Sequence, residues 1–108
     1  MCLIVLAHQL NADYPLIMAA NRDEFRQRPT QSMHWWPDIE ILAGKDLQAS
    51  GTWLALHKDG RWAAVTNFRR AAHYNLTPFK SRGHLAIDFL QQQKSALVFT
   101  HTLQTDQF

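Results

Sequence analysis

The sequence predicts an α+β fold, because two β-hairpin patterns come before a helical pattern instead of alternating with helices. Residues 2–9 and 14–20 are apolar runs separated by turn-forming residues. Residues 52–57 and 62–67 form a second pair of runs, on either side of an Asp-Gly turn. Residues 82–93 then repeat apolar side chains at helical spacing.

Length and composition fit a single domain, residues 1–108, with a hydrophobic core. The chain has 46% hydrophobic and only 19% charged residues, which argues against disorder. Eleven Lys and Arg against nine Asp and Glu give a net charge of +2. This excess is too small for a basic face that binds nucleic acid, so we expect no nucleic-acid partner.

The N-terminal run has neither the basic segment nor the cleavage pattern of a signal peptide, and it is too short to span a bilayer. A single cysteine cannot form an internal disulfide, so nothing requires an oxidising compartment. We expect a cytoplasmic protein with no membrane span.

In the first hairpin, residues 10–13 supply the turn. Both strands are apolar on both faces, which predicts a sheet covered on both sides. A turn centred between residues 11 and 12 sets Cys2 opposite Asn21. A register that differs by one or two residues sets Cys2 opposite another residue of 20–23.

A polar loop is expected over residues 22–32, and residues 39–43 are the one strand candidate before the second hairpin. In that hairpin, Asp59-Gly60 fits a two-residue type I′ turn, in which both residues need positive φ. The resulting register pairs Leu54 with Val65, His57 with Trp62, and Thr52 with Asn67.

Residues 68–81 are expected to form a loop containing Pro78. Ser81 is a suitable N-cap for the helix over residues 82–93, with its apolar face formed by Leu85, Phe89 and Leu90. The pattern of residues 95–103 fits a strand or a helix equally well.

Cys2 is the first residue with notable chemistry. Removal of the initiator methionine would leave a thiol and an α-amino group on the same residue, and such an amine activates nucleophiles in acyl transfer. The alternative is a buried structural thiol, since free cysteines are often buried. The hairpin brings Arg22 and Asp23 near this terminus, where an arginine favours the thiolate; otherwise the two form a solvated ion pair.

Several short motifs, in this order along the chain, resemble the NRDE-motif family, whose eukaryotic members are called transport and Golgi organisation protein 2. The resemblance covers residues 1 to about 90. The motifs are Met1-Cys2-Leu3-Ile4, Ala19-Ala20-Asn21-Arg22-Asp23-Glu24-Phe25, Arg28-Pro29, Ala43-Gly44-Lys45-Asp46, Gly51-Thr52-Trp53-Leu54, Gly60-Arg61-Trp62, Thr66-Asn67-Phe68-Arg69 and Ser81-Arg82-Gly83.

The family is similar to N-terminal nucleophile hydrolases, which implies a four-layer αββα sandwich. By that resemblance Cys2 attacks a small amide, Arg22 and Asp23 are the paired groups beside it, and Asn67 supports the oxyanion. Asn21, Trp53 and Arg69 are the candidate substrate-binding residues. Four layers need more than 108 residues, so we expect only the N-terminal portion of the sandwich, with an exposed sheet face that favours self-association.

The alternative function is a non-catalytic one. Eukaryotic members of the family are linked to haem mobilisation and to lipid and membrane-traffic homeostasis, which implies a carrier for haem or a lipid-like ligand. A third reading is an inactive, truncated relative. The segment His34-Trp35-Trp36-Pro37 either lines a pocket or caps the core. The six histidines lack zinc-site spacing, so we expect no metal or resident cofactor, although a single histidine could ligate haem.

Overall fold

The computed structural model describes residues 2–67 and 81–103, and this part of the chain has the predicted α+β architecture. A two-stranded antiparallel sheet, here called the ribbon, consists of β1 (Leu3–His8) and β2 (Leu16–Asn21). A four-stranded sheet has the order β3-β4-β5-β6. Its strands are β3 (Thr30–Trp36), β4 (Ile41–Asp46), β5 (Leu54–His57) and β6 (Trp62–Ala64). Two helices follow, α1 (His84–Gln91) and α2 (Ala96–His101).

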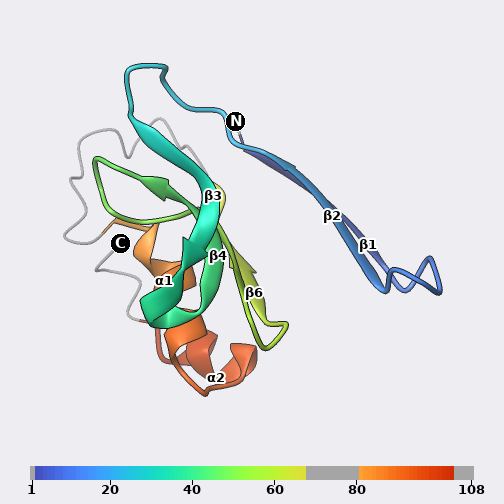
Figure 1. Cartoon of the computed structure of the whole chain (residues 1–108). Coiled ribbons are helices and arrows are strands. Elements are labelled where there is room, and N and C mark those ends of the chain that lie inside the picture. The colour runs from blue at the N-terminus through green and yellow to red at the C-terminus, as the bar shows by residue number, and fades with distance from the viewer. Residues whose placement is uncertain (1, 68–80, 104–108) are drawn as a thin grey trace.

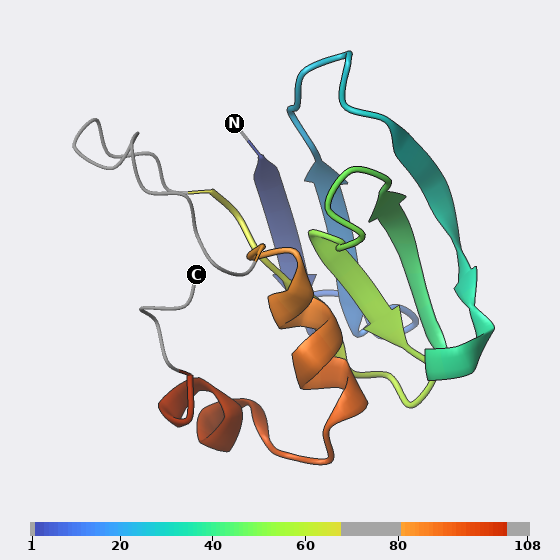
Figure 2. The same cartoon turned by 90° about the vertical axis from the view of Figure 1, so that its left-hand side faces the viewer.

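The helices and the ribbon lie on opposite sides of the four-stranded sheet. Figure 1 shows the ribbon slanting away from the sheet, so that its tip is far from the body of the molecule. In Figure 2, α1 lies in front of the sheet and the ribbon lies behind it. The described residues therefore form three layers: helices, four-stranded sheet and ribbon.

The hydrophobic core lies between the four-stranded sheet and α1. Ile41, Ala43 and Ala55 are fully buried on the sheet, and Ala86 and Leu90 are almost fully buried on the helix. Small side chains on the two strands let the helix approach closely, and the larger Ile41 and Leu90 fill the space between them.

The C-terminal end of α1 is fixed by Arg61, which precedes β6. Its guanidinium donates hydrogen bonds to the carbonyl oxygens of Leu90 (3.0 Å) and Gln92 (2.6 Å), and it lies 5.7 Å from the centre of the Phe89 ring. The last carbonyls of a helix have no partner within the helix, so a cation at this end stabilises it.

The first predicted hairpin is confirmed, but its register differs by one residue from the expected one. Leu3, not Cys2, pairs with Asn21. The turn is longer than expected, because Gln9 has a positive φ of 56° and its N–H donates to the carbonyl of Pro15. Continuing the observed register by one residue brings Cys2 opposite Arg22.

The expectation that the ribbon is covered on both sides is wrong for the described residues. On the outer face, Leu3, Val5 and Ile17 are 62%, 55% and 47% exposed. No described element packs over them, so this apolar face meets solvent in the chain as it stands.

The second hairpin is also confirmed, again with a register shifted by one residue. Leu54 pairs with Ala64 and Leu56 with Trp62, so the expected pairs Leu54–Val65, His57–Trp62 and Thr52–Asn67 are wrong. Gly60 alone in this turn has a positive φ, of 91°, whereas a type I′ turn needs two such residues. The N–H of His57 instead donates to the carbonyl of Arg61, which encloses a three-residue loop.

Other boundaries differ from the sequence expectations as well. Strand β3 was not expected, and it begins inside the expected polar loop of residues 22–32. The strand expected over 39–43 runs from Ile41 to Asp46. Helix α1 begins at His84, with Gly83 and not Ser81 at its N-cap. The Ser81 hydroxyl accepts a hydrogen bond from the Gly83 N–H in the turn before the helix.

The ambiguous segment 95–103 contains a helix, α2, because the Ser95 hydroxyl accepts a hydrogen bond from the N–H of Val98 as an N-cap. The loop expected over residues 68–81 falls outside the described residues, except for Ser81.

Candidate functional site

A cavity of about 700 Å³ lies where the base of the ribbon meets the four-stranded sheet. The ribbon contributes Cys2 and Ala20 to its lining, and the sheet contributes Met33, Gly44 and Leu54. The segment that leads into α1 closes another side. Cavities of roughly 300–1,000 Å³ are typical of small-molecule sites, so this one has a suitable size.

The ribbon turns one of its two faces toward the sheet. Ile4 pairs with Ala20 and Leu6 with Met18, and side chains alternate along each strand. Cys2 and Ala20 line the cavity at the base, while Leu6 lines a second hollow nearer the tip. These residues therefore form the inner face of the ribbon.

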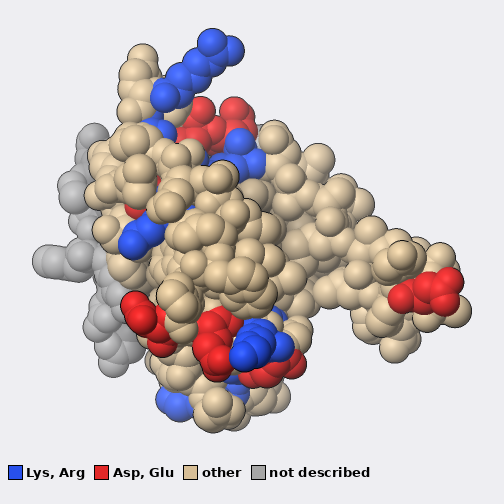
Figure 3. Space-filling model, viewed as in Figure 1, with Lys and Arg blue, Asp and Glu red and all other residues tan. Residues whose placement is uncertain are grey.

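The second hollow, of about 410 Å³, is lined by ribbon residues and by the β5–β6 hairpin. Its lining residues are Leu6, His8, Pro15, Leu16, Gly60 and Trp62. We call the two hollows, with the inner face of the ribbon and the facing side of the sheet, the cleft. In Figure 3 the visible face of the ribbon is uncharged except for acidic atoms at its far end. Asp13 is the only charged residue between positions 3 and 21.

Four of the predicted site residues line the cavity together: Cys2, Arg22, Trp53 and Asn67. They come from the N-terminus, the end of β2, the start of β5 and the end of the β6 segment, so the fold brings together residues far apart in sequence. Asn21 and Asp23 are exposed and do not line the cavity. Arg69 lies outside the described residues.

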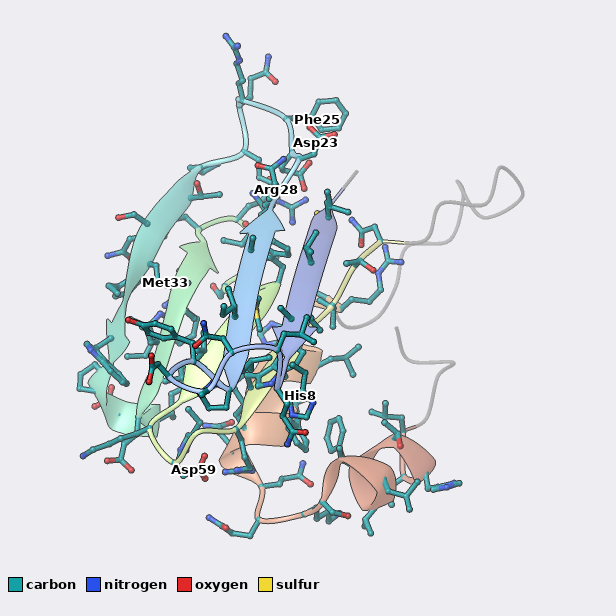
Figure 4. All side chains as sticks on the ribbon, turned by 90° about the vertical axis from the view of Figure 1, so that its right-hand side faces the viewer. His8, Asp23, Phe25, Arg28, Met33 and Asp59 are labelled. Carbon is teal, nitrogen blue, oxygen red and sulfur yellow. The ribbon has the colours of Figure 1, made fainter. Side chains whose placement is uncertain are left out.

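The mouth of the cavity carries a cluster of charged side chains that we call the arginine corner: Arg22, Glu24, Arg28 and Asp46. Arg28 makes two short contacts with Oδ2 of Asp46, at 2.7 Å from both Nε and Nη2. Arg22 lies farther from its partners, at 3.5 Å from Oδ2 of Asp46 and 3.4 Å from Glu24. Figure 4 shows Arg28 where the loop after the ribbon approaches the strand ends.

Asp46 occupies the centre of this corner. Its burial alone would raise the pKa, but the hydrogen bonds from Arg28 and from the N–H groups of Gln48 and Ala49 outweigh burial and lower the pKa of Asp46. The carboxylate therefore stays ionised at neutral pH and keeps the two arginines at the mouth of the cavity.

Sequence reasoning did not identify Arg28 and Asp46 as site residues, although both lie in motifs that resemble the family. They are 18 residues apart, and only the pairing of β3 with β4 brings them together. No short motif records such a contact. The only signal in the sequence was that a basic residue precedes β3 and an acidic residue ends β4.

The aromatic segment expected to line a pocket or to cap the core is divided between two environments. Trp36 packs against the core, and its indole N–H donates to the carbonyl of Ala43. Trp35 is 55% exposed. Neither indole lines the cavity, so the segment caps the core through one of its two tryptophans.

Among residues 2–67 and 81–103, both helices are too short to span a membrane. The same residues hold no group of three or more histidine, cysteine, aspartate or glutamate side chains that could bind a metal ion.

Comparison with known proteins identifies relatives over nearly the whole chain. Residues 1–107 match the family model of transport and Golgi organisation 2. An uncharacterized protein of Saccharomyces cerevisiae is 36% identical over 102 residues, which cover 88% of this chain and 32% of the yeast protein. The transport and Golgi organization 2 homologue of Mus musculus is 35% identical over 97 residues, covering 86% of this chain and 34% of its own.

The human homologue is 37% identical over 95 residues, covering 80% of this chain and 32% of its own length. The chain thus spans about a third of the length of the curated relatives that it matches. No solved structure matches it. By its sequence, the chain belongs to the transport and Golgi organisation 2 family.

Proposed function

We propose that the chain serves the transport and Golgi organisation role of its family as a non-catalytic carrier, which binds haem or a lipid-like molecule in the cleft. The observation that carries this proposal is the pair of apolar surfaces that face each other across the cleft. When an apolar ligand excludes water from such surfaces, binding is favoured by about 25 cal/mol for each Å² of apolar surface that is buried.

The chemistry of the cleft fits an elongated ligand with an apolar body and a charged end. Leu6 and Leu16 of the ribbon and Trp62 of the sheet offer an apolar surface near the tip. At the base, Arg22 and Arg28 are paired with Glu24 and Asp46, and Lys45 and Arg82 also line the cavity, so the charged side chains of the lining carry a net positive charge. His8 is exposed and lines the apolar hollow, so its imidazole would hold the iron of a haem bound there.

A pair of substitutions on one strand tests this proposal. Leu6→Asn alters the inner face of the ribbon, whereas Leu3→Asn makes the same change on the outer face. Burial of a leucine side chain stabilises by about 1.5–3 kcal/mol, so losing this contact with ligand weakens binding by roughly tenfold or more. We expect a saturable Soret shift when the protein is titrated with haem, weakened by Leu6→Asn and unchanged by Leu3→Asn.

The carrier proposal also predicts that the Soret shift survives Cys2→Ala, since no covalent step is involved. His8→Ala is expected to change the Soret position if His8 ligates the iron, and to leave a lipid-like ligand unaffected. No saturable shift with the unaltered protein, or equal losses for Leu6→Asn and Leu3→Asn, would contradict haem binding in the cleft.

A second candidate function rests on the shared location of Cys2 and Arg22 at the cavity. In this candidate, the α-amino group of Cys2 takes the thiol proton and the thiolate attacks the carbonyl of a small amide. The C–N bond then breaks, the amine leaves with that proton, and water hydrolyses the Cys2 thioester to free the acid and restore the thiol. Asn67 stabilises the oxyanion, and Trp53 contacts the substrate. Arg69 and Asn21 remain substrate-binding candidates, and Asp23 a partner of the α-amino group.

This candidate has its own decisive measurements. An intact-mass spectrum reveals whether Met1 is removed, and the mechanism requires its removal. Alkylation by iodoacetamide at neutral pH is expected to be faster at Cys2 than at a free model thiol, because this mechanism requires an activated nucleophile. Retention of Met1, or amide turnover that survives Cys2→Ala, would exclude Cys2 as the nucleophile.

A further inference from the structure

We propose that Asp46 is the positioning residue of the cleft. Its carboxylate, at the end of β4, binds the two arginines that follow the ribbon, Arg22 and Arg28. These contacts set the separation between the ribbon and the sheet. This inference deepens the proposed function, since it concerns how far the same ligand cleft opens.

The first support is the connection between ribbon and sheet. Arg22 directly follows β2, and Arg28 lies in the loop that continues from it to β3. Both contact the same oxygen, Oδ2 of Asp46, at 3.5 Å and 2.7 Å. The N–H of Leu47 also donates to the carbonyl of Pro29. Polar contacts between the exit of the ribbon and β4 therefore converge at one end of the cleft.

The second support is the rigidity of the base that holds Asp46. Its other oxygen, Oδ1, accepts hydrogen bonds from the N–H groups of Gln48 and Ala49, at 2.9 and 3.2 Å. Its own N–H donates to the carbonyl of Gly51 at 2.9 Å. One carboxylate oxygen thus fixes the turn after β4, and the other holds the arginines.

The third support is the form of the ribbon. A two-stranded hairpin is marginally stable by itself and has little to resist a rotation at its base. The tip lies far from the sheet (Figure 1), so the angle at the base decides the width of the cleft at the tip. With about 3.3 Å per residue, a ribbon of about 20 Å that rotates by roughly 15° moves its tip by about 5 Å.

The test measures the opening of the cleft without any ligand. Spin labels are attached to cysteines introduced at Ala12, in the ribbon turn, and at Lys58, in the β5–β6 turn, with Cys2→Ser to remove the native thiol. Asp46→Asn keeps the shape of the side chain and removes its charge. We expect the distribution of label distances to broaden and its mean to rise by about 5 Å.

Three further variants make this result specific. Arg28→Gln is expected to widen the cleft in the same way while leaving the turn hydrogen bonds of Asp46 intact. If Asp46→Asn does not fold, the label distances of Arg28→Gln alone test the positioning role. Asp46→Glu retains the charge and is expected to keep a distribution close to that of the parent. Asp38→Asn makes the same chemical change at an exposed site outside the cavity, and it is expected to have no effect.

Haem titration of the same variants separates this inference from the proposed function. We expect Asp46→Asn to weaken haem binding by about tenfold, which corresponds to about 1.4 kcal/mol. Unchanged label distances in both Asp46→Asn and Arg28→Gln would overturn the positioning role even if haem binds. Widened distances in a protein that does not bind haem would support the positioning role and overturn haem carriage.

Discussion

Replacement of Gly51 by alanine is expected to destabilise the fold at the floor of the cavity. A Cβ atom at this position would lie 2.8–2.9 Å from the backbone atoms of Gly83, and the two segments are joined by a hydrogen bond from the Thr52 N–H to the Gly83 carbonyl, at 3.0 Å. Neither backbone can move away without breaking that bond or shifting the start of α1.

The expected cost follows from the geometry. Overpacking of a filled interior costs about 1–3 kcal/mol, and a domain of this kind has only about 5–15 kcal/mol of stability. With a urea dependence of about 1–3 kcal/mol per M, the midpoint of unfolding falls by roughly 1 M. Tryptophan fluorescence reports the transition, because the chain has four tryptophans.

A matched control makes the result interpretable. Gly44→Ala adds the same methyl group in β4, where the nearest atom is the carbonyl oxygen of Gln31 at 3.3 Å, so a smaller loss is expected. If Gly51→Ala unfolds at the same urea concentration as Gly44→Ala, the close approach of Gly51 and Gly83 does not limit packing, and the reasoning is refuted.

Three other outcomes are expected from the same contacts. Arg61→Ala removes two hydrogen bonds from a guanidinium to the last carbonyls of α1, so the free energy of unfolding falls by about 1–3 kcal/mol in urea titrations; a loss no greater than that of an exposed substitution such as Lys94→Ala would contradict the cap. Leu90→Ala leaves a cavity in the core and is expected to lower the free energy of unfolding by about 2–5 kcal/mol in thermal or urea unfolding. An unchanged midpoint would show that Leu90 is not in the core. The pKa of Asp59 is lowered to about 2, chiefly by the N–H of Arg61. The contribution of this carboxylate to the free energy of unfolding is therefore complete above its unfolded pKa of 3.8 and is lost as the pH falls through about 2. Acid unfolding of Asp59→Asn should lack this part of the pH dependence, and acid profiles identical to those of the parent would argue against it.

The sequence predicted the elements whose signals are local. Both hairpins and α1 exist because apolar runs and turn residues specify them within short segments. The register of the second hairpin was wrong by one residue, and that of the first differs by one residue from the centre of its expected range, since the backbone conformation in each turn sets the register. A positive φ at Gln9 in the first turn, and at Gly60 alone in the second, is not readable from residue types.

Strand β3 (Thr30–Trp36) was not predicted at all, and a local irregularity is one reason. The pairing of β3 with β4 shifts between Gln31 and His34, and such a bulge disturbs the alternation that marks a strand in a sequence. The polar residues Thr30 to Ser32 also resemble the end of a loop, so this part of the strand was assigned to the loop.

The candidate site was predictable where it depended on the first hairpin. Cys2 and Arg22 were expected near each other, and both line the cavity. Asp46 was not identified, because its role depends on contacts with Arg22 and Arg28 across the sheet-to-ribbon junction. Contacts of this kind come from tertiary structure, and one sequence does not contain their pattern.

Hydrogen exchange of the ribbon, with and without haem, tests the central claim most directly. A free two-stranded ribbon exchanges its amide hydrogens quickly, because little packing opposes its local opening. A ligand between the ribbon and the sheet should slow exchange in Leu3–His8 and Leu16–Asn21, and also in Leu54–His57 of the facing sheet. Slowed exchange confined to α2, or none at saturating haem, would contradict a ligand-binding cleft between these two layers.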